Sequence, residues 1–295
     1  GEADTEAPVK TVALAIMGEL QRVDEKTTIA DRVVKPYRKH RVVVFMTLQA
    51  KRAHVPVEWH RERFANLPSF DDAGERERAR SIAHRFLAAG ASRVVVYVYN
   101  LEKLPPLMPT TQGEQMRFRS SWMSYVLHCL TRSFVLQNIV RYEREHPDLV
   151  IDTVLELRGD AYWAADIPPL HTFDAEMVHV KKCLNWKGYN DKFAMMPRKY
   201  MVAWMDLLGH YYQDTVVSYW NSEIMSRMLA QHFGIPVSQH ATTFVTTDYN
   251  WWLEPEDASK TGGPDHGCFP KNYYSDTCMP HGMKEHFNAK LCAIN

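Results

Sequence analysis

The chain has 295 residues, 45% of them hydrophobic, so it is long enough to bury one large core and short for two. Its 35 basic and 35 acidic side chains cancel, which gives no reason to expect a nucleic-acid partner, because nucleic-acid binders carry a basic excess or stripe. No stretch approaches the roughly 20 apolar residues that a membrane helix needs, so we expect no membrane span in this sequence.

Strands and helices alternate in the first half of the chain. Residues 9–17, 41–48 and 92–100 are continuous β-branched runs, which are typical of buried parallel strands. Residues 71–91 begin with an Asp pair, continue with apolar residues three and four apart and end near a Gly, which predicts a helix. A second, longer helix is predicted from about 114 to 145, where His-Pro-Asp ends it.

A fourth strand follows in DLVIDTVLELRGDAYW and runs out into an Arg-Gly-Asp turn. The second half is less regular, and from residue 248 the sequence is rich in Trp, Tyr, Gly and Pro without periodicity. The remaining elements that we expect are strands over 176–182 and 192–197, helices over 198–212 and 221–234, and a final strand over 235–247.

Alternating strands and helices predict an α/β fold, with a Rossmann-type, mainly parallel sheet and helices on both faces. We expect one domain over residues 1–247 and an irregular C-terminal extension over 248–295 that packs on it. Cys268 and Cys278 in this extension fit a disulfide or ordinary thiols better than a zinc site with nearby histidines, because the spacings match none of the usual compact zinc patterns.

Ligands on such sheets bind beyond the carboxyl ends of the strands, and polar residues gather at those ends here. The first strand is followed by GELQR, which has one glycine where dinucleotide-binding turns have two or three. Walker, nucleophile-elbow and His-Glu-x-x-His motifs are also missing from the sequence. The residues at the strand ends are Gly18, Glu19, Gln21 and Arg22, then Asn100, then Arg158 and Asp160, then Asn190 and Asp191, with Glu223 opening a helix.

Four runs resemble, in the same order, motifs of a GT-A-type family of nucleotide-sugar glycosyltransferase-like proteins from algae, their large viruses and bacterial capsule loci. These runs are VALAIMGELQR, QNIVRYEREHPDLVIDTVLELRGDAYW, GYNDKFAMM and NSEIMSRMLAQHFGIPV, within residues 9–245. The family pattern usually has Arg-Pro-Asp where this chain has Gly159 between Arg158 and Asp160. The resemblance implies a GT-A fold that holds a sugar nucleotide.

Sugar transfer from a nucleoside diphosphate requires positive charge near the leaving diphosphate. Asp160 is the expected ligand of Mn²⁺ or Mg²⁺, although Arg158 can meet phosphate directly, so metal-assisted and cation-assisted versions both stay open. A local salt bridge between these two residues is the structural alternative. The donor-binding residues that we expect are Gly18, Arg22, Asn100, Arg158 and Asp160.

An inverting enzyme also needs a base for the acceptor hydroxyl, and the catalytic candidates are Glu223 and Asp191. We assign the base to Glu223 and the binding of sugar hydroxyls to Asp191. Their structural alternatives are a helix-dipole contact for Glu223 and an Asx turn for Asp191. Trp186, Tyr189 and Phe193 flank Asp191 as a possible platform for a sugar ring. The residues expected to bind acceptor or sugar are Asn190, Trp186, Tyr189 and Trp220.

Two smaller groups have an ordinary structural interpretation. Lys181, Lys182 and Lys187 fit a pyrophosphate site, but a solvated face explains them more simply. His179 and His240 are better explained as hydrogen-bonded core or rim residues than as ligands.

The sequence therefore predicts a glycosyltransferase that moves a sugar from a nucleoside-diphosphate sugar to a glycan, glycoprotein or small-molecule acceptor, with inversion. The alternative is a catalytically silent relative that binds carbohydrate or nucleotide, and a hydrolase or methyltransferase outside this family is a third possibility. The polar GEADTEAPVK opening suggests a trimmed N-terminus. We accordingly expect a Golgi or secretory-pathway lumen reached through a removed anchor, with the cytoplasm as the alternative.

Overall fold

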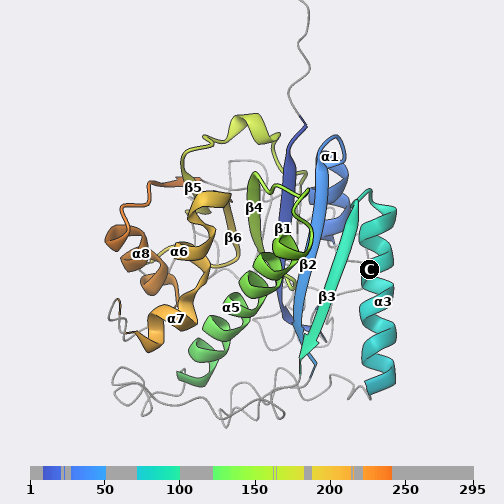
Figure 1. Cartoon of the computed structure of the whole chain (residues 1–295), viewed down its shortest axis with the longest axis horizontal. Helices are drawn as coiled ribbons and strands as arrows, with labels where there is room; N and C mark the ends of the chain where they lie inside the picture. The colour runs from blue at the N-terminus through green and yellow to red at the C-terminus, as the bar shows by residue number, and fades with distance from the viewer. Residues whose placement is uncertain are drawn as a thin grey trace, which may run out of the picture.

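In the part of the chain that the structure describes, a sheet of seven strands forms the middle layer, with helices on both faces (Figure 1). The computed structural model describes residues 9–20, 23, 28–50, 72–99, 122–161, 163, 165–182, 188–213, 215 and 222–240. This arrangement confirms the expected α/β class and the mainly parallel sheet.

The strand order is β3-β2-β1-β4-β6-β5-β7. All strands run parallel except β6, which is antiparallel to both of its neighbours. The strands are β1 (Thr11–Glu19), β2 (Arg41–Gln49), β3 (Arg93–Tyr99), β4 (Thr153–Arg158), β5 (Val178–Lys181), β6 (Phe193–Pro197) and β7 (Val237–His240).

The strand order reverses between β1 and β4. The chain passes outward from β1 to β2 and β3, and then returns to pair β4 with the other side of β1. At the carboxyl end of this pair Met17 lies opposite Arg158. Ligands of open α/β sheets bind at such a switch point, outside the carboxyl ends of the strands. Glu19 at the end of β1 and the polar residues of the turn after β4 lie there.

Alternate residues of each strand enter two different cores, as the two-residue period of a strand requires. One core contains Leu14 and Phe193 and is covered by α3 (Asp72–Ala88) and by the short helices η2 (Ala30–Val34) and α1 (Lys35–Tyr37). The other core contains Ala13 and Ala194 and is covered by the remaining helices. These are α5 (Trp122–Glu145), α6 (Met201–Met205) and α8 (Ser222–His232), joined by η5 (Arg198–Tyr200) and α7 (Leu207–Tyr212).

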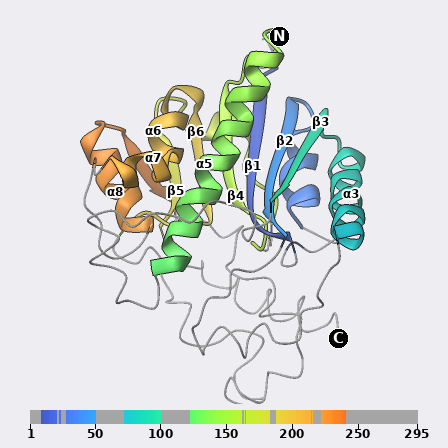
Figure 2. The same cartoon turned by 60° about the horizontal axis from the view of Figure 1, so that its bottom comes forward.

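Helix α5 crosses this second face over β1 and β2, and its N-terminal end lies near the carboxyl edge of the sheet (Figure 2). A further short turn, η4 (Leu170–Thr172), belongs to the segment that covers the first face.

Several helix boundaries differ from those predicted from the sequence. The single helix expected over 198–212 is broken at Asp206, whose backbone leaves the helical region at φ −79° and ψ 53°. Its carboxylate accepts the Gly209 N–H at 3.2 Å and caps a new helix. The helix over 30–37 was not predicted, because it is short and contains Pro36, although Ala30, Val33, Val34 and Tyr37 have helical spacing and are buried.

Other expectations lie partly or wholly outside the described residues. These are the first turns of the long helix before residue 122, the end of the final strand over 241–247, and the extension over 248–295 with its cysteines. Within the described part of the chain, none of the helices combines the length and the apolar character that crossing a bilayer requires.

Candidate functional site

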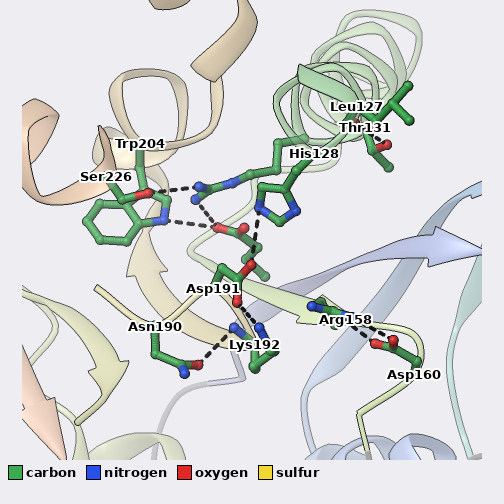
Figure 3. A network of polar contacts seen from close by, with 12 residues as sticks. Leu127, His128, Thr131, Arg158, Asp160, Asn190, Asp191, Lys192, Trp204 and Ser226 are labelled. Atoms are coloured by element: carbon green, nitrogen blue, oxygen red, sulfur yellow. Dashed lines mark hydrogen bonds and ion pairs between the residues drawn. The ribbon is translucent and has the colours of Figure 1, made fainter. Parts of the chain in front are cut away.

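The candidate site lies along the carboxyl edge of the sheet, at the switch point. Because β6 is antiparallel, its start meets the end of β4, with Phe193 paired to Leu157. The loop before β6 therefore lies beside the turn after β4, although about thirty residues of sequence separate the two. Lys181 reaches the same edge from the end of β5. Figure 3 shows how the polar side chains of this edge converge.

The turn after β4 holds Arg158 and Asp160 against each other. The Arg158 guanidinium donates to both carboxylate oxygens of Asp160, at 2.9 and 2.6 Å, and Asp160 is almost fully buried. The Gly159 N–H donates to the Met17 carbonyl at 2.8 Å, a bond that a proline could not make. A Cβ at Gly159 would also lie 2.6 Å from a methyl group of Val23. The local salt bridge is thus present, and Gly159 joins this turn tightly to β1.

The loop before β6 docks on the first turn of α8. The Tyr189 N–H donates to the Glu223 carbonyl at 2.9 Å. At Gly188 a Cβ would lie 1.9 Å from the Glu223 carbonyl carbon, so only glycine fits this approach. Asn190 closes an Asx turn by accepting the Lys192 N–H at 2.9 Å. The sequence offered an Asx turn as the structural alternative for Asp191. The structure forms this turn at the neighbouring Asn190 instead.

The Asp191 side chain is 8% exposed and charged. Its carboxylate contacts the ammonium of Lys192 and lies 3.7 Å from Nε2 of His128, which comes from α5 (Figure 3). Burial opposes the charged form, but the positive charge of Lys192, with a smaller contribution from Arg158, holds the pKa of Asp191 well below its usual range. Asp191 is therefore ionised at neutral pH.

Glu223 has the opposite character. It lies in the first turn of α8 with 6% of its surface exposed. Burial and then the negative charge of Asp191 raise the pKa of Glu223 to about 7, against the weaker influence of Lys192 and Arg158. Two carboxylates of one site thus have pKa values pushed apart, one fixed as an anion and one able to take or give a proton near neutrality.

A buried ion pair between Arg132 and Glu156 connects the elements around Asp191 and Glu223. Arg132 of α5, 1% exposed, donates to Glu156 of β4 at 2.6 Å and to Ser226 of α8 at 2.9 Å. The indole N–H of Trp204 donates to the same Glu156 oxygen at 2.9 Å. One side chain therefore ties α5, β4 and α8 together, one helical turn from Glu223. The sequence showed no sign of this network, because its members are 24 and 94 residues apart.

The aromatic platform expected around Asp191 does not form from Phe193. Phe193 is fully buried and packs against Trp163 in the first core, with ring centroids 5.9 Å apart. Tyr189 stacks on Trp204 in the second core. The two rings lie on opposite faces of the sheet, and the buried 193–196 run anchors the loop to it.

Lys181 is not part of a solvated face, although its neighbour Lys182 is exposed. Burial, with a smaller effect of Lys192, lowers the pKa of Lys181 to about 8. His179 and His240 hydrogen-bond to each other at 2.7 Å, and the second ring nitrogen of His179 meets the Asp174 carbonyl at 2.8 Å. This pairing agrees with their interpretation as hydrogen-bonded residues of the core and rim.

The surroundings of Asp160 do not fit a metal ion well. Mg²⁺ and Mn²⁺ prefer carboxylate oxygens, yet Arg158 donates to both oxygens of Asp160 and brings a positive charge to the same place. Among the described residues there is also no group of three His, Cys, Asp or Glu side chains placed to hold a metal. The charge of Arg158 therefore opposes the binding of a cation at Asp160.

The structure brings together Gly18, Arg158, Asp160, Tyr189, Asn190, Asp191 and Glu223 at one edge of the sheet. Four predicted site residues, Arg22, Asn100, Trp186 and Trp220, lie outside the described residues. Sequence reasoning missed Lys192, His128 and Arg132. The direct proximity of Lys192 to the Asn-Asp pair was the one signal that could have found any of these.

Comparison with models of known protein families finds no match to this chain, and comparison with curated protein sequences finds none either. The functional conclusion therefore rests on the geometry of the site and on the sequence motifs that converge there.

Proposed function

We propose that this protein is a glycosyltransferase that transfers a sugar from a nucleoside-diphosphate sugar to a hydroxyl of a glycan, glycoprotein or small molecule, with inversion. The observation that carries the proposal is the pair of oppositely tuned carboxylates, Asp191 and Glu223, beside the cations Arg158 and Lys192. This combination provides an anion, a proton acceptor and positive charge at one sheet switch point.

Glu223 would serve as the base. A general base is most effective when its pKa lies close to the working pH, and the pKa of Glu223 is raised to about 7. The carboxylate would take the proton of the acceptor hydroxyl while the oxygen of that hydroxyl bonds to the anomeric carbon. The bond from that carbon to the diphosphate breaks at the same time, and the electron pair leaves with the diphosphate.

Positive charge would stabilise the departing diphosphate. Arg158 is the best-placed group, because its planar guanidinium can exchange the Asp160 carboxylate for two phosphate oxygens. Lys192 adds a second cation next to Asp191. A divalent ion held by Asp160 would be the other source of positive charge, but Arg158 engages both oxygens of this carboxylate.

The resemblance to GT-A-type proteins supports the same conclusion. Its four motifs are dispersed over more than 200 residues of sequence, yet Gly18, Asp160, Asp191 and Glu223, one from each motif, lie at the same edge of the sheet. A Golgi or secretory-pathway lumen, or else the cytoplasm, would then be the place of the reaction.

One observation favours the alternative of a catalytically silent binding protein. Asp160 already has both oxygens engaged by Arg158, which leaves the site with one fewer carboxylate for a metal. Such a relative would still bind a sugar nucleotide through Arg158 and Lys192.

A screen of UDP-, GDP- and CMP-sugars by thermal shift, with and without Mn²⁺, separates these possibilities. Ligand at 100 times its dissociation constant stabilises a protein by about 2.7 kcal/mol, which the shift readily detects. An enzyme would then release nucleoside diphosphate from the sugar nucleotide that binds, when acceptor is present. A silent relative would show the same thermal shift without release, and the absence of any shift would refute both.

A further inference from the structure

His128 faces Asp191 across a short gap that no hydrogen bond closes. Its Nε2 lies 3.7 Å from the Asp191 carboxylate oxygen, which is too long for a hydrogen bond. The Nε2 atom is buried, and within the described part of the chain it has no hydrogen-bond partner. Figure 3 shows the imidazole of His128 turned toward this carboxylate.

The imidazole is neutral under ordinary conditions. Burial, helped by the charges of Arg132, Arg158 and Lys192 and opposed by that of Asp191, lowers the pKa of His128 to about 3. A neutral ring carries one N–H, and the neighbouring carboxylate favours the tautomer with that proton on Nε2. A donor and a charged acceptor therefore face each other without contact.

A hydroxyl group is the ligand chemistry that completes this arrangement. Its oxygen can accept from Nε2 and its proton can go to Asp191, each at about 2.8 Å. An ammonium group cannot accept, whereas a carbonyl or an ionised phosphate oxygen cannot donate. Phosphate would in addition be repelled by the charge of Asp191.

We propose that His128 and Asp191 form a subsite that binds one hydroxyl of the sugar being transferred or of the sugar that accepts it. This subsite rests on the proposed function and names two of its specificity-determining side chains. Each of these two side chains is fixed by a part of the protein that lies away from the gap. Lys192 fixes the other oxygen of Asp191, and His128 projects from the rigid helix α5. The hydroxyl would lie close to Glu223, whose carboxylate senses the charge of Asp191.

Deoxy analogues test the subsite directly. With the sugar nucleotide and acceptor that turn over, each sugar hydroxyl is removed in turn and kcat/KM is measured for the wild type and for His128→Phe. One analogue should lose about 10- to 100-fold with the wild type, because it leaves a buried donor and acceptor unpaired. The same analogue should lose clearly less with His128→Phe than with the wild type, because the variant has already lost one of the two hydrogen bonds that the hydroxyl makes.

The matched control is His84→Phe, because His84 is exposed on α3 at the opposite face of the sheet. This variant should behave like the wild type with every analogue. If the losses from His128→Phe and from deoxygenation add for every hydroxyl, the subsite assignment is wrong.

Imidazole nitrogen NMR on the wild-type protein needs no variant and keeps the two proposals distinguishable. Glucose, galactose, mannose and xylose are the probes, with inorganic phosphate as the negative control. The Nε2 signal of His128 should respond to at least one sugar and not to phosphate. A response without any sugar-nucleotide turnover would remove the proposed function and leave the subsite. Turnover without a response to any sugar would overturn the subsite alone, and the absence of both would overturn both proposals.

Discussion

Gly188 lies directly against the backbone of Glu223, so closely that a Cβ would stand 1.9 Å from the carbonyl carbon and 2.0 Å from the carbonyl oxygen. The next residue, Tyr189, donates its N–H to that same oxygen. The loop that carries Asp191 and the helix that carries Glu223 are therefore fixed to each other as one unit. The separation of their pKa values depends on this fixed relationship.

Gly188→Ala should push the loop away from α8. Overpacking of this kind typically costs about 1–3 kcal/mol, which denaturant unfolding measures. Turnover should fall as well, because the base and its neighbours lose their positions. Gly90→Ala is the matched control, since Gly90 has a φ of +107° at the end of α3, far from the site. It should lose stability and keep turnover. Equal turnover in both variants would contradict the coupling.

The pH dependence of turnover should move in opposite directions in two neighbouring variants. A base works when deprotonated, so activity should rise with pH through about 7, the pKa of Glu223. Asp191 raises that pKa and Lys192 lowers it. Asp191→Asn should therefore shift the acid limb of the kcat profile to lower pH, and Lys192→Met should shift it to higher pH.

The control for this pair is Asp166→Asn, which changes the charge of an exposed carboxylate paired with Arg32. Its profile should match that of the wild type, because exposed charges are screened by solvent. Shifts of the same sign in Asp191→Asn and Lys192→Met would show that the acid limb does not report Glu223.

Removal of divalent ions distinguishes the two ways of meeting the diphosphate. Because Arg158 engages both oxygens of Asp160, we expect turnover in EDTA to stay close to that in Mn²⁺. Arg158→Gln should then lower both donor affinity and turnover, by roughly 10²- to 10³-fold in kcat, as the loss of one charge-stabilising donor typically does. Activity that disappears in EDTA and returns with Mn²⁺ would instead assign the diphosphate to a metal on Asp160.

Much of the fold and part of the site follow from the sequence alone. The β-branched runs, the helix over 72–88 and the position of Arg158 at the end of β4 follow from local patterns of the sequence and from the geometry of parallel sheets. Asp191 reaches the same edge because β6 is antiparallel, which the sequence did not predict. The direction of side chains is harder to predict. Phe193 looked like a sugar platform because it follows Asp191 in sequence, but the two-residue period of β6 turns it into the core.

The rest of the site depends on contacts that no local pattern encodes. His128 and Arg132 lie within the apolar spacing of a long helix, and only the packing of α5 over the sheet brings them to Asp191 and Glu156. The break at Asp206 is similar, because helix propensity alone does not distinguish a helical Asp from one that caps the next helix.

Removing one partner of the buried Arg132–Glu156 pair should lower the free energy of unfolding strongly, whereas replacing both partners should lower it little. Arg132→Met leaves Glu156 buried without its partner, and we expect the free energy of unfolding to fall by about 3–5 kcal/mol. Adding Glu156→Gln should recover most of this loss, because Gln is uncharged and still accepts from Trp204. The control is Arg32→Met, which breaks the exposed Arg32–Asp166 pair and should lower the free energy of unfolding by less than about 1 kcal/mol. A double variant as unstable as Arg132→Met would contradict this account.

The most direct test of the central claim compares binding and turnover in Glu223→Gln. With the sugar nucleotide that stabilises the wild type, calorimetry should give nearly the same affinity for the variant, because Glu223 is assigned to the acceptor hydroxyl. Release of nucleoside diphosphate in the presence of acceptor should fall by about 10²- to 10⁴-fold, the usual contribution of a general base. Turnover close to that of the wild type, or a product that keeps the anomeric configuration of the donor, would contradict the assignment of Glu223 as the base of an inverting transferase.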